Sequence, residues 1–198
     1  MALLEWNDIL NETLIRLKYI KSPFQLLLSK STESVSININ RNLKSIEPNL
    51  KDDDLILFMD DDIWIDEHFE ELITEMKEYN VDYISPKFLN KKGGVGCLFP
   101  TATMACMFMK PEIFKKVGFM DERFKKSQYN DTDYLIRIVK EGGFRKRYSD
   151  KVSIIHAREN FGTGKRACKP QIWHQLNFLR CVKKHGSNFM GYLLDDYM

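Results

Sequence analysis

The most constraining feature of this sequence is a short apolar run at residues 55–59 (LILFM) with aspartates on both sides. Asp52–Asp54 precede the run and Asp60–Asp62 follow it directly. The run is too short for a buried helix, and unbroken aliphatic residues between charged turns are typical of a strand buried on both faces of a sheet. We therefore predict that residues 55–59 form a central strand.

The aspartates that follow this run come directly after the carboxyl end of the predicted strand. Ligand sites in open α/β sheets lie just beyond the carboxyl ends of strands, and alternate residues of an extended chain point the same way. Asp60 and Asp62 are therefore expected to share one target. Two crowded carboxylates repel each other unless a cation lies between them, and oxygen ligands suit Mg²⁺ or Mn²⁺. The alternative is a solvated strand end, which is how we interpret Asp52–Asp54.

The rest of the chain alternates between expected helices and expected strands. Apolar residues at helical spacing predict helices, and short apolar runs predict strands. The expected helices are 5–20, around 42–46, 66–80 with Asp66 as N-cap, 111–118, 131–143 and 171–186. The expected strands are 24–28, 55–59, 81–89 running into a sheet edge, 102–110 and 151–157. This alternation predicts an α/β layered sheet.

Composition limits the classes of partner. The chain has 198 residues, which fits one domain, and 30 basic against 28 acidic residues leave a net charge of +2. This balance argues against a nucleic-acid partner, because phosphate contacts require an excess of basic residues. The four cysteines show no C-x-x-C spacing, so neither a zinc site nor a redox motif is indicated. Without a signal-peptide pattern or a transmembrane segment, we predict a cytoplasmic location.

Two blocks of the sequence together resemble a known family. The segment DDLILFMDDDIWID (53–66) is similar to the strand and D-x-D segment of family 2-type nucleotide-sugar glycosyltransferases. The segment from ATMACMFMKPEIFKKVGFMDERF to NDTDYLIRIVKEGGFRKRYSDKVSIIHA (102–157) is similar to a second block of that family. The resemblance covers about residues 52–157 and implies the GT-A fold, in which helices flank a mixed central sheet.

The resemblance also implies how the chain is divided. It predicts a single GT-A-like domain over residues 1–198. Residues 1–50 would form a divergent nucleotide-side part, and residues 52–157 would hold the D-x-D segment and the acceptor-side core. Residues 158–198 would form a basic loop and a C-terminal helix.

The activity that the resemblance implies is metal-dependent sugar transfer. A sugar would move from a nucleotide-diphosphate donor, with a UDP-sugar favoured, to a hydroxyl of an acceptor glycan. Asp62 would bind Mn²⁺ or Mg²⁺ at the diphosphate, Asp60 and Asp61 would contact the donor, and Asp60 would also be a ligand of the metal. His156, after the last core strand, would complete the metal shell, as in several enzymes of this fold. The alternative for His156 is a surface or packing role.

The family's catalytic base corresponds to Asp131. The acidic pair that is usual in the family is Asn130-Asp131 here, so the first acid is absent and acceptor recognition is expected to differ. In inverting members the aspartate deprotonates the acceptor hydroxyl, and the N-terminus of a helix would keep it ionised. Asp133 is an alternate candidate. Both aspartates can also be interpreted as ordinary acids at a helix N-terminus.

The remaining candidates are contacts to the donor and the acceptor. The basic side chains Arg41, Lys165 and Arg166 are expected to bind the nucleotide diphosphate, although the loop that holds the last two can also be a plain basic surface. The candidates for contacts to the sugar or the acceptor are Trp64, Asn130, Asp133 and Gly94. A core position is the alternative for Trp64.

The N-terminal part departs from the family's pattern. Family members begin with a strand and loop that bind the nucleobase, whereas this chain begins at what looks like the helix after them. Leu28 and Lys30 stand where an aspartate and a glycine are expected. The chain can therefore be a shortened enzyme, a fragment of a larger polypeptide with further domains, or a non-catalytic sugar- or nucleotide-binding module. A haloacid-dehalogenase-type phosphatase also has a strand followed by D-x-D, but Trp64 replaces the Thr or Val expected there.

Overall fold

The structure is a computed structural model that describes residues 10–28, 34–89, 104–125, 129–157 and 172–191. The chain forms two compact units, and each is considered separately. The first contains residues 1–25, 57–108 and 146–168, and the second contains residues 26–56, 109–145 and 169–198.

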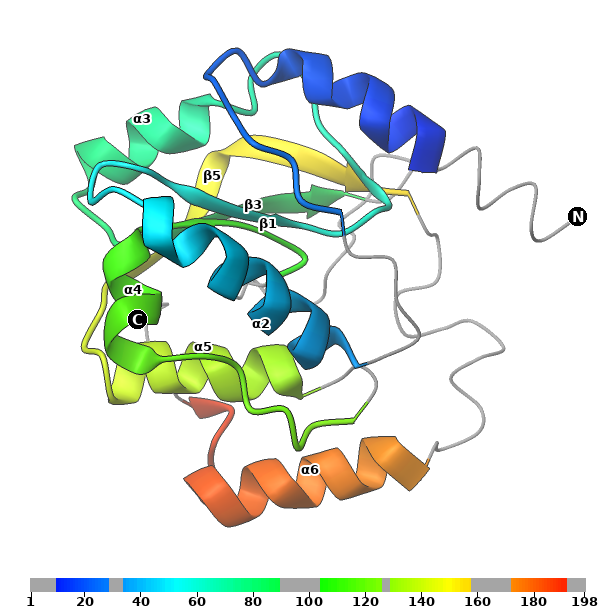
Figure 1. The fold of residues 1–198 in the computed structure, drawn as a ribbon, viewed down its shortest axis with the longest axis vertical. Coiled ribbons are helices and arrows are strands. Elements are labelled where there is room, and N and C mark those ends of the chain that lie inside the picture. Colours follow the sequence, from blue (N-terminus) through cyan, green and yellow to red (C-terminus); the bar gives the residue numbers. More distant parts are fainter. Residues whose placement is uncertain (1–9, 29–33, 90–103, 126–128, 158–171, 192–198) are drawn as a thin grey trace, which may run out of the picture. The chain divides into compact units, whose positions relative to one another are not determined.

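A mixed sheet forms the framework of the first unit (Figure 1). Among the described residues, the sheet has the strand order β1-β4-β3-β5-β2. The strands are β1 (Ile56–Met59), β2 (Ile63–Trp64), β3 (Tyr83–Leu89), β4 (Cys106–Met109) and β5 (Lys146–His156). β5 pairs parallel with β3 and antiparallel with β2. The predicted α/β class with a mixed sheet is confirmed.

Two strands lie at other positions in the sheet than the sequence predicts. β1 lies at one end of the described strand order and β3 lies in its middle, so the predictions of a central strand at 55–59 and an edge at 81–89 are wrong. The burial pattern agrees, because Tyr83, Ile84 and Phe88 are at most 1% exposed. Leu57, Phe58 and Met59 are only half-buried. An apolar run indicates burial, but it does not distinguish an edge strand from a central one.

Pro86 explains why the sequence of β3 suggests an edge. Proline lacks a backbone N–H and is normally excluded from the interior of a sheet. The pairing of β3 with β5 shifts register between Ser85 and Lys87, where Ser85 faces Tyr148 and Lys87 faces Ser153. This irregularity places the proline where no regular ladder hydrogen bond is required.

The first unit also contains the helix α3 (Glu71–Glu78), which packs against β3 and β5. Its inward side carries Leu72 and Met76, both at most 3% exposed, as the apolar spacing predicts, and the fully buried Phe69 lies in the turn before the helix. The predicted N-cap at Asp66 is wrong, because α3 begins after Glu70. Asp66 instead accepts a hydrogen bond from the backbone N–H of His68 within the preceding turn, at 3.0 Å.

The N-terminal segment is partly as predicted. Residues 10–16 are helical and continue into the 3₁₀ turn η1 (Leu17–Tyr19); residues 1–9 lie outside the described part. The strand predicted at 24–28 is wrong, because Phe24, Leu26 and Leu28 are 52%, 46% and 66% exposed in irregular backbone. A strand is stable only when a neighbour pairs with it, and no neighbour is encoded in the run itself.

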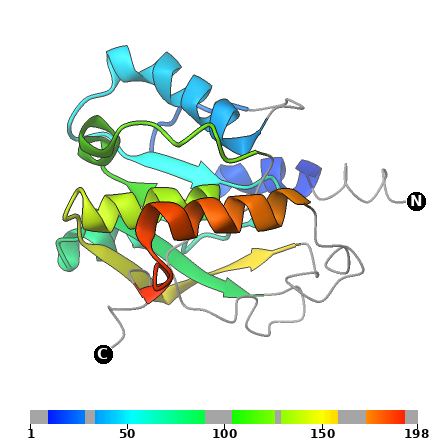
Figure 2. The ribbon, with the colours of Figure 1, turned by 90° about the horizontal axis from the view of Figure 1, so that it is seen from below.

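The described elements of the second unit are helical (Figure 2). They are α2 (Val35–Ile46), η2 (Glu47–Asn49), α4 (Pro111–Val117), α5 (Asn130–Lys140) and α6 (Ile172–His185). Pro111 at the first position of α4 and Gly118 after its end, with φ of +79°, match the predicted start and stop. The side-chain amide of Asn40 in α2 accepts a hydrogen bond from the N–H of Met120 at 2.8 Å and donates one to its carbonyl at 2.9 Å. No helix in the described segments is long and apolar enough to cross a membrane.

Candidate metal centre

The three aspartates after β1 lie in a tight turn of the first unit. The backbone N–H of Ile63 donates to the carbonyl of Asp60 at 3.3 Å, which closes the turn between β1 and β2. The N–H of Asp60 donates to the carbonyl of Ala105 at 2.8 Å, which ties the start of the turn to the residue before β4. The end of one strand and the start of the next therefore determine where the carboxylates lie.

Two further hydrogen bonds hold the middle and the end of this turn. The buried hydroxyl of Thr13 donates to the carbonyl of Asp61 at 3.0 Å. The N–H of Ala157, directly after β5, donates to the carbonyl of Asp62 at 2.8 Å. The backbone of all three aspartates is thus fixed by separate parts of the unit, which reduces the conformational entropy that a ligand would otherwise have to remove.

The pairing of β2 with β5 brings a histidine to the turn. Ile63 lies opposite His156 in the antiparallel register, so the residue before Ile63 meets the end of β5. The Nε2 atom of His156 lies 3.4 Å from the Oδ1 atom of Asp62. The imidazole also lies near the ring of Phe88, with 6.4 Å between centroids. The sequence predicts His156 at a strand end, and the structure puts that strand end beside Asp62.

Asp60, Asp62 and His156 together form a group that can hold a metal ion. Each offers one ligand atom, and these atoms all lie within 4.8 Å of one another. Opposite ligands of a small divalent cation are about 4.2 Å apart, because metal–oxygen distances are about 2.1 Å. A slight inward movement of the side chains would therefore bring all three ligand atoms to one ion. Asp62 and His156 are 3% and 8% exposed, whereas Asp60 is exposed, so the group is open on one side.

The chemistry of the donor set favours some cations over others. Two carboxylates and one imidazole suit a borderline divalent ion such as Mn²⁺ better than Mg²⁺, which prefers oxygen ligands alone. The exposed side of Asp60 leaves room for water or for oxygen atoms of a substrate on the same ion. Such an open site is typical of a catalytic metal rather than a structural one.

Asp61 and Trp64 lie beside this group but are not members of it. The side chain of Asp61 is exposed, and its backbone carbonyl accepts the bond from Thr13. Trp64 is half-buried, with the guanidinium of Arg16 5.4 Å from the centre of its ring. Arg16 also donates to the carbonyl of Ile65 at 3.1 Å. The contacts expected between these residues and a donor or a sugar stay predictions.

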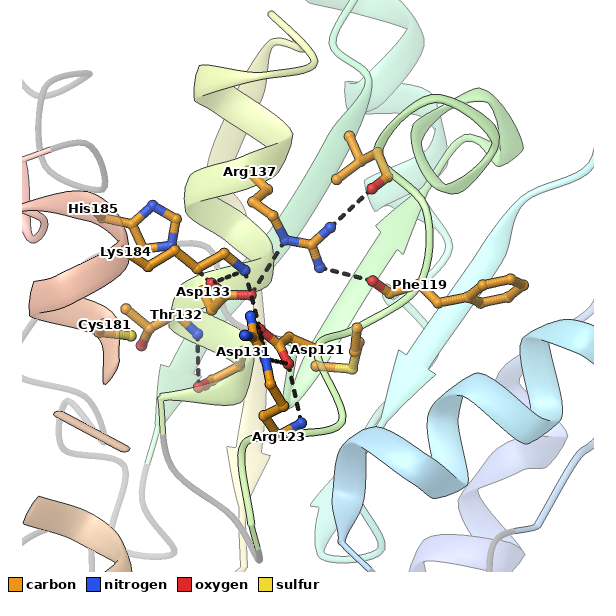
Figure 3. A network of polar contacts seen from close by, with 12 residues as sticks. Phe119, Asp121, Arg123, Asp131, Thr132, Asp133, Arg137, Cys181, Lys184 and His185 are labelled. Carbon is orange, nitrogen blue, oxygen red and sulfur yellow. Dashed lines mark hydrogen bonds and ion pairs between the residues drawn. The ribbon is translucent and has the colours of Figure 1, made fainter. Parts of the chain in front are cut away.

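The second unit contains the other predicted acids, Asp131 and Asp133, in the first turn of α5 (Figure 3). Asp133 is fully buried, and its carboxylate is surrounded by basic groups. The Nε of Arg137 donates to its Oδ2 at 3.2 Å. The Nζ of Lys184 and the Nε2 of His185, both from α6, lie 2.7 Å from its Oδ1. The carboxylate of Asp133 therefore links α5 to α6, and its expected contact with a substrate stays a prediction.

Arg137 extends this network to the end of α4. Its Nη1 donates to the carbonyl of Val117 and its Nη2 to the carbonyl of Phe119, both at 2.8 Å. The network was not predicted from the sequence, although Asp133 and Arg137 are four residues apart, which is the spacing of an ion pair on a helix. The sequence holds no comparable signal for the contacts from Lys184 and His185.

Asp131 has a different environment from Asp133. It is partly buried, and the backbone N–H of Thr132 donates to its Oδ1 at 2.8 Å. Burial raises the pKa of the Asp131 carboxyl above its usual value, and the hydrogen bond from Thr132 only partly opposes this. A raised pKa suits a general base, because proton transfer is most efficient when the pKa of the base approaches the working pH. Asn130, the first residue of α5, is 5% exposed.

The other sequence candidates are distributed as follows. Arg41 is exposed on α2, and nothing in the structure tests its expected contact with a nucleotide. Gly94, Lys165 and Arg166 lie outside the described residues.

Comparisons with known proteins add no assignment. No protein-family model matches this sequence, and no curated protein matches it. Within the described residues, the Asp60–Asp62–His156 group is therefore the feature that bears most directly on function.

Proposed function

We propose that this protein is a metal-dependent glycosyltransferase that moves a sugar from a nucleotide-diphosphate donor to a hydroxyl of an acceptor glycan. The observation that carries the proposal is the convergence of Asp60, Asp62 and His156 within 4.8 Å at the end of β1 and β5. The D-x-D pattern and the histidine are far apart in the chain, and the resemblance implies that both bind the metal. Their convergence supports that resemblance.

The proposed roles follow from the chemistry of each side chain. Asp62 and His156, which are buried, would hold the cation, and Asp60 would bind it from the exposed side and orient the donor. A bound Mn²⁺ or Mg²⁺ supplies positive charge that stabilises the leaving nucleoside diphosphate. The hydrogen bonds that fix the backbone of the turn keep the carboxylates in place, so little reorganisation is needed when the donor binds.

Asp131 is proposed as the general base, with inversion at the anomeric carbon. Its carboxylate would take the proton of the acceptor hydroxyl while that oxygen forms a bond to the anomeric carbon. The bond between the anomeric carbon and the diphosphate oxygen breaks in the same step, and the nucleoside diphosphate leaves with the electron pair. The raised pKa of Asp131 supports this role, because it makes the carboxylate a stronger base than an exposed aspartate.

A second candidate is a module that binds a sugar nucleotide without transferring the sugar. The observation that favours it is the irregular, exposed segment 24–28, where the resemblance implies a strand of the nucleotide side. The segment can still contact a nucleotide as a loop, so this observation bears on the affinity for the base rather than on the metal group. The two candidates differ in whether nucleotide is released from the donor.

The first test is calorimetric titration with UDP-, GDP- and dTDP-sugars, each with and without Mn²⁺. We expect one donor class to bind only with Mn²⁺, and Asp62→Asn to weaken this binding by more than about 100-fold, since loss of an outer-shell partner alone costs about 10–100-fold. Asp53→Asn, which changes an exposed aspartate before β1, is the matched control and should bind like the wild type.

The second test separates transfer from binding. Release of nucleoside diphosphate would be measured with a panel of acceptor glycans for the wild type and for Asp131→Asn. A glycosyltransferase releases nucleotide with at least one acceptor, and Asp131→Asn binds the donor but releases none above background. Mn²⁺-dependent binding without release from the wild type would favour the binding module. Absence of Mn²⁺-dependent binding for every donor would contradict both candidates.

A further inference from the structure

The helix α6 exposes its apolar side and buries polar residues. Ile172, Leu176 and Leu179 recur at helical spacing on one side and are 65%, 41% and 58% exposed. On the opposite side Asn177 is fully buried and His185 is 8% exposed. A helix that only covers a core has the reverse arrangement. Single exposed apolar residues are common, but three aligned on one helix face form a patch that indicates a binding surface.

Hydrogen bonds hold α6 in this rotation. The side-chain amide of Asn177 donates to the carbonyl of Lys125 at 2.9 Å. The thiol of Cys181 contacts the carbonyl of Tyr129 at 3.6 Å, and burial raises the pKa of this thiol to about 12, so that it stays protonated. His185 contacts Asp133 at 2.7 Å, as the close view shows (Figure 3). Turning the apolar side of α6 inward would break all three contacts, so its exposure belongs to the fold.

Basic side chains gather near the C-terminal end of α6. A cavity of about 310 Å³ is lined by Arg123, Arg180, Lys183 and Lys184. Lys183 is exposed and follows Leu179 by four residues, so it continues the same side of the helix. Arg180 is held in place, because its Nη1 donates to the carbonyl of Arg123 at 2.6 Å and its Cζ lies 5.5 Å from the centre of the Phe124 ring.

Among the described residues, two carboxylates contact these basic groups. Asp121 lies 2.6 Å from Arg123 and 3.4 Å from Lys184, and Asp133 lies 2.7 Å from Lys184. The four basic groups of the cavity thus exceed the two carboxylates in contact with them. A net positive site beside an aliphatic strip has the composition of helices that lie in the interface of an anionic membrane.

We propose that α6 docks this protein onto a lipid bilayer that contains anionic phospholipids. Ile172, Leu176 and Leu179 enter the boundary between headgroups and acyl chains. The cavity of Arg123, Arg180, Lys183 and Lys184 receives lipid phosphates. A soluble phosphate compound would explain the basic cavity but not the aliphatic strip, and an apolar protein groove would explain the strip but not the excess charge. This inference does not depend on the proposed sugar transfer.

The test is sedimentation of the full chain with vesicles of phosphatidylcholine alone and of phosphatidylcholine mixed with phosphatidylserine. We expect binding to the mixed vesicles that weakens as salt is added. Lys183→Glu removes one positive and adds one negative charge, so it should weaken binding about 25-fold, at about fivefold for each charge. The double variant with Leu176→Ser and Leu179→Ser should weaken binding at least about tenfold.

Matched controls separate these effects from general changes in charge and hydropathy. Ile15→Ser removes an apolar residue that is 57% exposed on the 10–16 helix, and Lys77→Glu makes the same charge change on α3. Both controls should bind like the wild type, and thermal unfolding should be unchanged for all variants. Wild-type protein that does not sediment with mixed vesicles would overturn the proposal. An unchanged affinity in the double-serine variant would also overturn it and would indicate a site for a soluble anion. A wild-type dimer in solution that the double-serine variant dissociates would overturn it as well.

Discussion

Among the described residues, two buried contacts join an aspartate to a histidine, and their surroundings differ. Asp62 lies 3.4 Å from His156 in the first unit, with Asp60 as the third member of the group. Asp133 lies 2.7 Å from His185 in the second unit, together with Arg137 and Lys184. The first group contains two carboxylates and one imidazole, whereas the second contains one carboxylate and three basic side chains.

The difference shows how charge balance separates a ligand site from a structural link. A group whose members sum to negative charge is stabilised when a cation binds, because its carboxylates repel one another. A carboxylate enclosed by a guanidinium and an ammonium is already neutralised, and its value to the protein lies in joining the elements that supply those groups. A contact between an aspartate and a histidine therefore does not by itself distinguish a ligand site from a structural link.

The largest expected effect is on stability, from Asp133→Ala. This change leaves Arg137, Lys184 and His185 without their shared carboxylate, and breaking a buried ion pair in this way costs about 3–5 kcal/mol. Urea unfolding of the metal-free protein would measure the loss.

The matched change in the other group is Asp62→Ala. Asp62→Ala should lower the free energy of unfolding by only a fraction of the loss in Asp133→Ala. Removing one of two crowded carboxylates also removes the repulsion between them. Equal losses of unfolding free energy in the two variants would contradict the distinction between a ligand site and a structural link.

The second effect is on metal affinity, from His156→Ala. We expect Mn²⁺ to bind at least about tenfold more weakly, by comparison with the 10–100-fold that loss of an outer-shell partner costs. At a concentration of 100 times its Kd, Mn²⁺ should raise the free energy of unfolding of the wild type by about 2.7 kcal/mol. His185→Ala is the comparison variant, and a similar loss of Mn²⁺ affinity there would show that the histidine contacts do not define the site.

The smallest effect concerns the pH dependence of stability, from Asp131→Asn. Burial raises the pKa of Asp131 in the folded state above its value in the unfolded chain. The ionised form therefore opposes folding, and this unfavourable contribution is present at neutral pH and disappears as the pH falls through the folded-state pKa. Asp131→Asn should be slightly more stable than the wild type at pH 7, and the difference should vanish under acid conditions.

Thermal unfolding measured from acid to neutral pH would follow this difference. Asp150→Asn, which changes an exposed aspartate of β5, serves as the control. A gain in stability at acid pH rather than at neutral pH would contradict the assignment of the raised pKa to Asp131.

Local sequence signals predicted the elements of this fold well where the signal was complete within one segment. Pro111 and Gly118 bound α4 as expected, and the apolar residues of α3 lie on the predicted side. The position of each strand in the sheet was not predictable in this way, because it depends on which partners pair with it. The exposed segment 24–28 and the end position of β1 are the two consequences.

The candidate site shows the same limit. Asp60 and Asp62 were expected to share a target from their spacing, and His156 entered only through the resemblance to a known family. Their convergence depends on the register of β2 with β5, which no local pattern specifies. The link from Asp133 to His185 was missed because its partners come from a distant helix.

The register of the two-residue strand β2 also bears on how the protein is synthesised. β2 and the aspartates are made early, but their partners His156 and Ala157 lie at the end of β5 and directly after it, and β5 is the last strand among the described residues. Chains emerge from the ribosome N-terminus first, so a nascent chain that ends before β5 holds the D-x-D segment without its histidine. The complete ligand group then exists only after the final strand has been added, and the growing chain acquires the full group in a single late step.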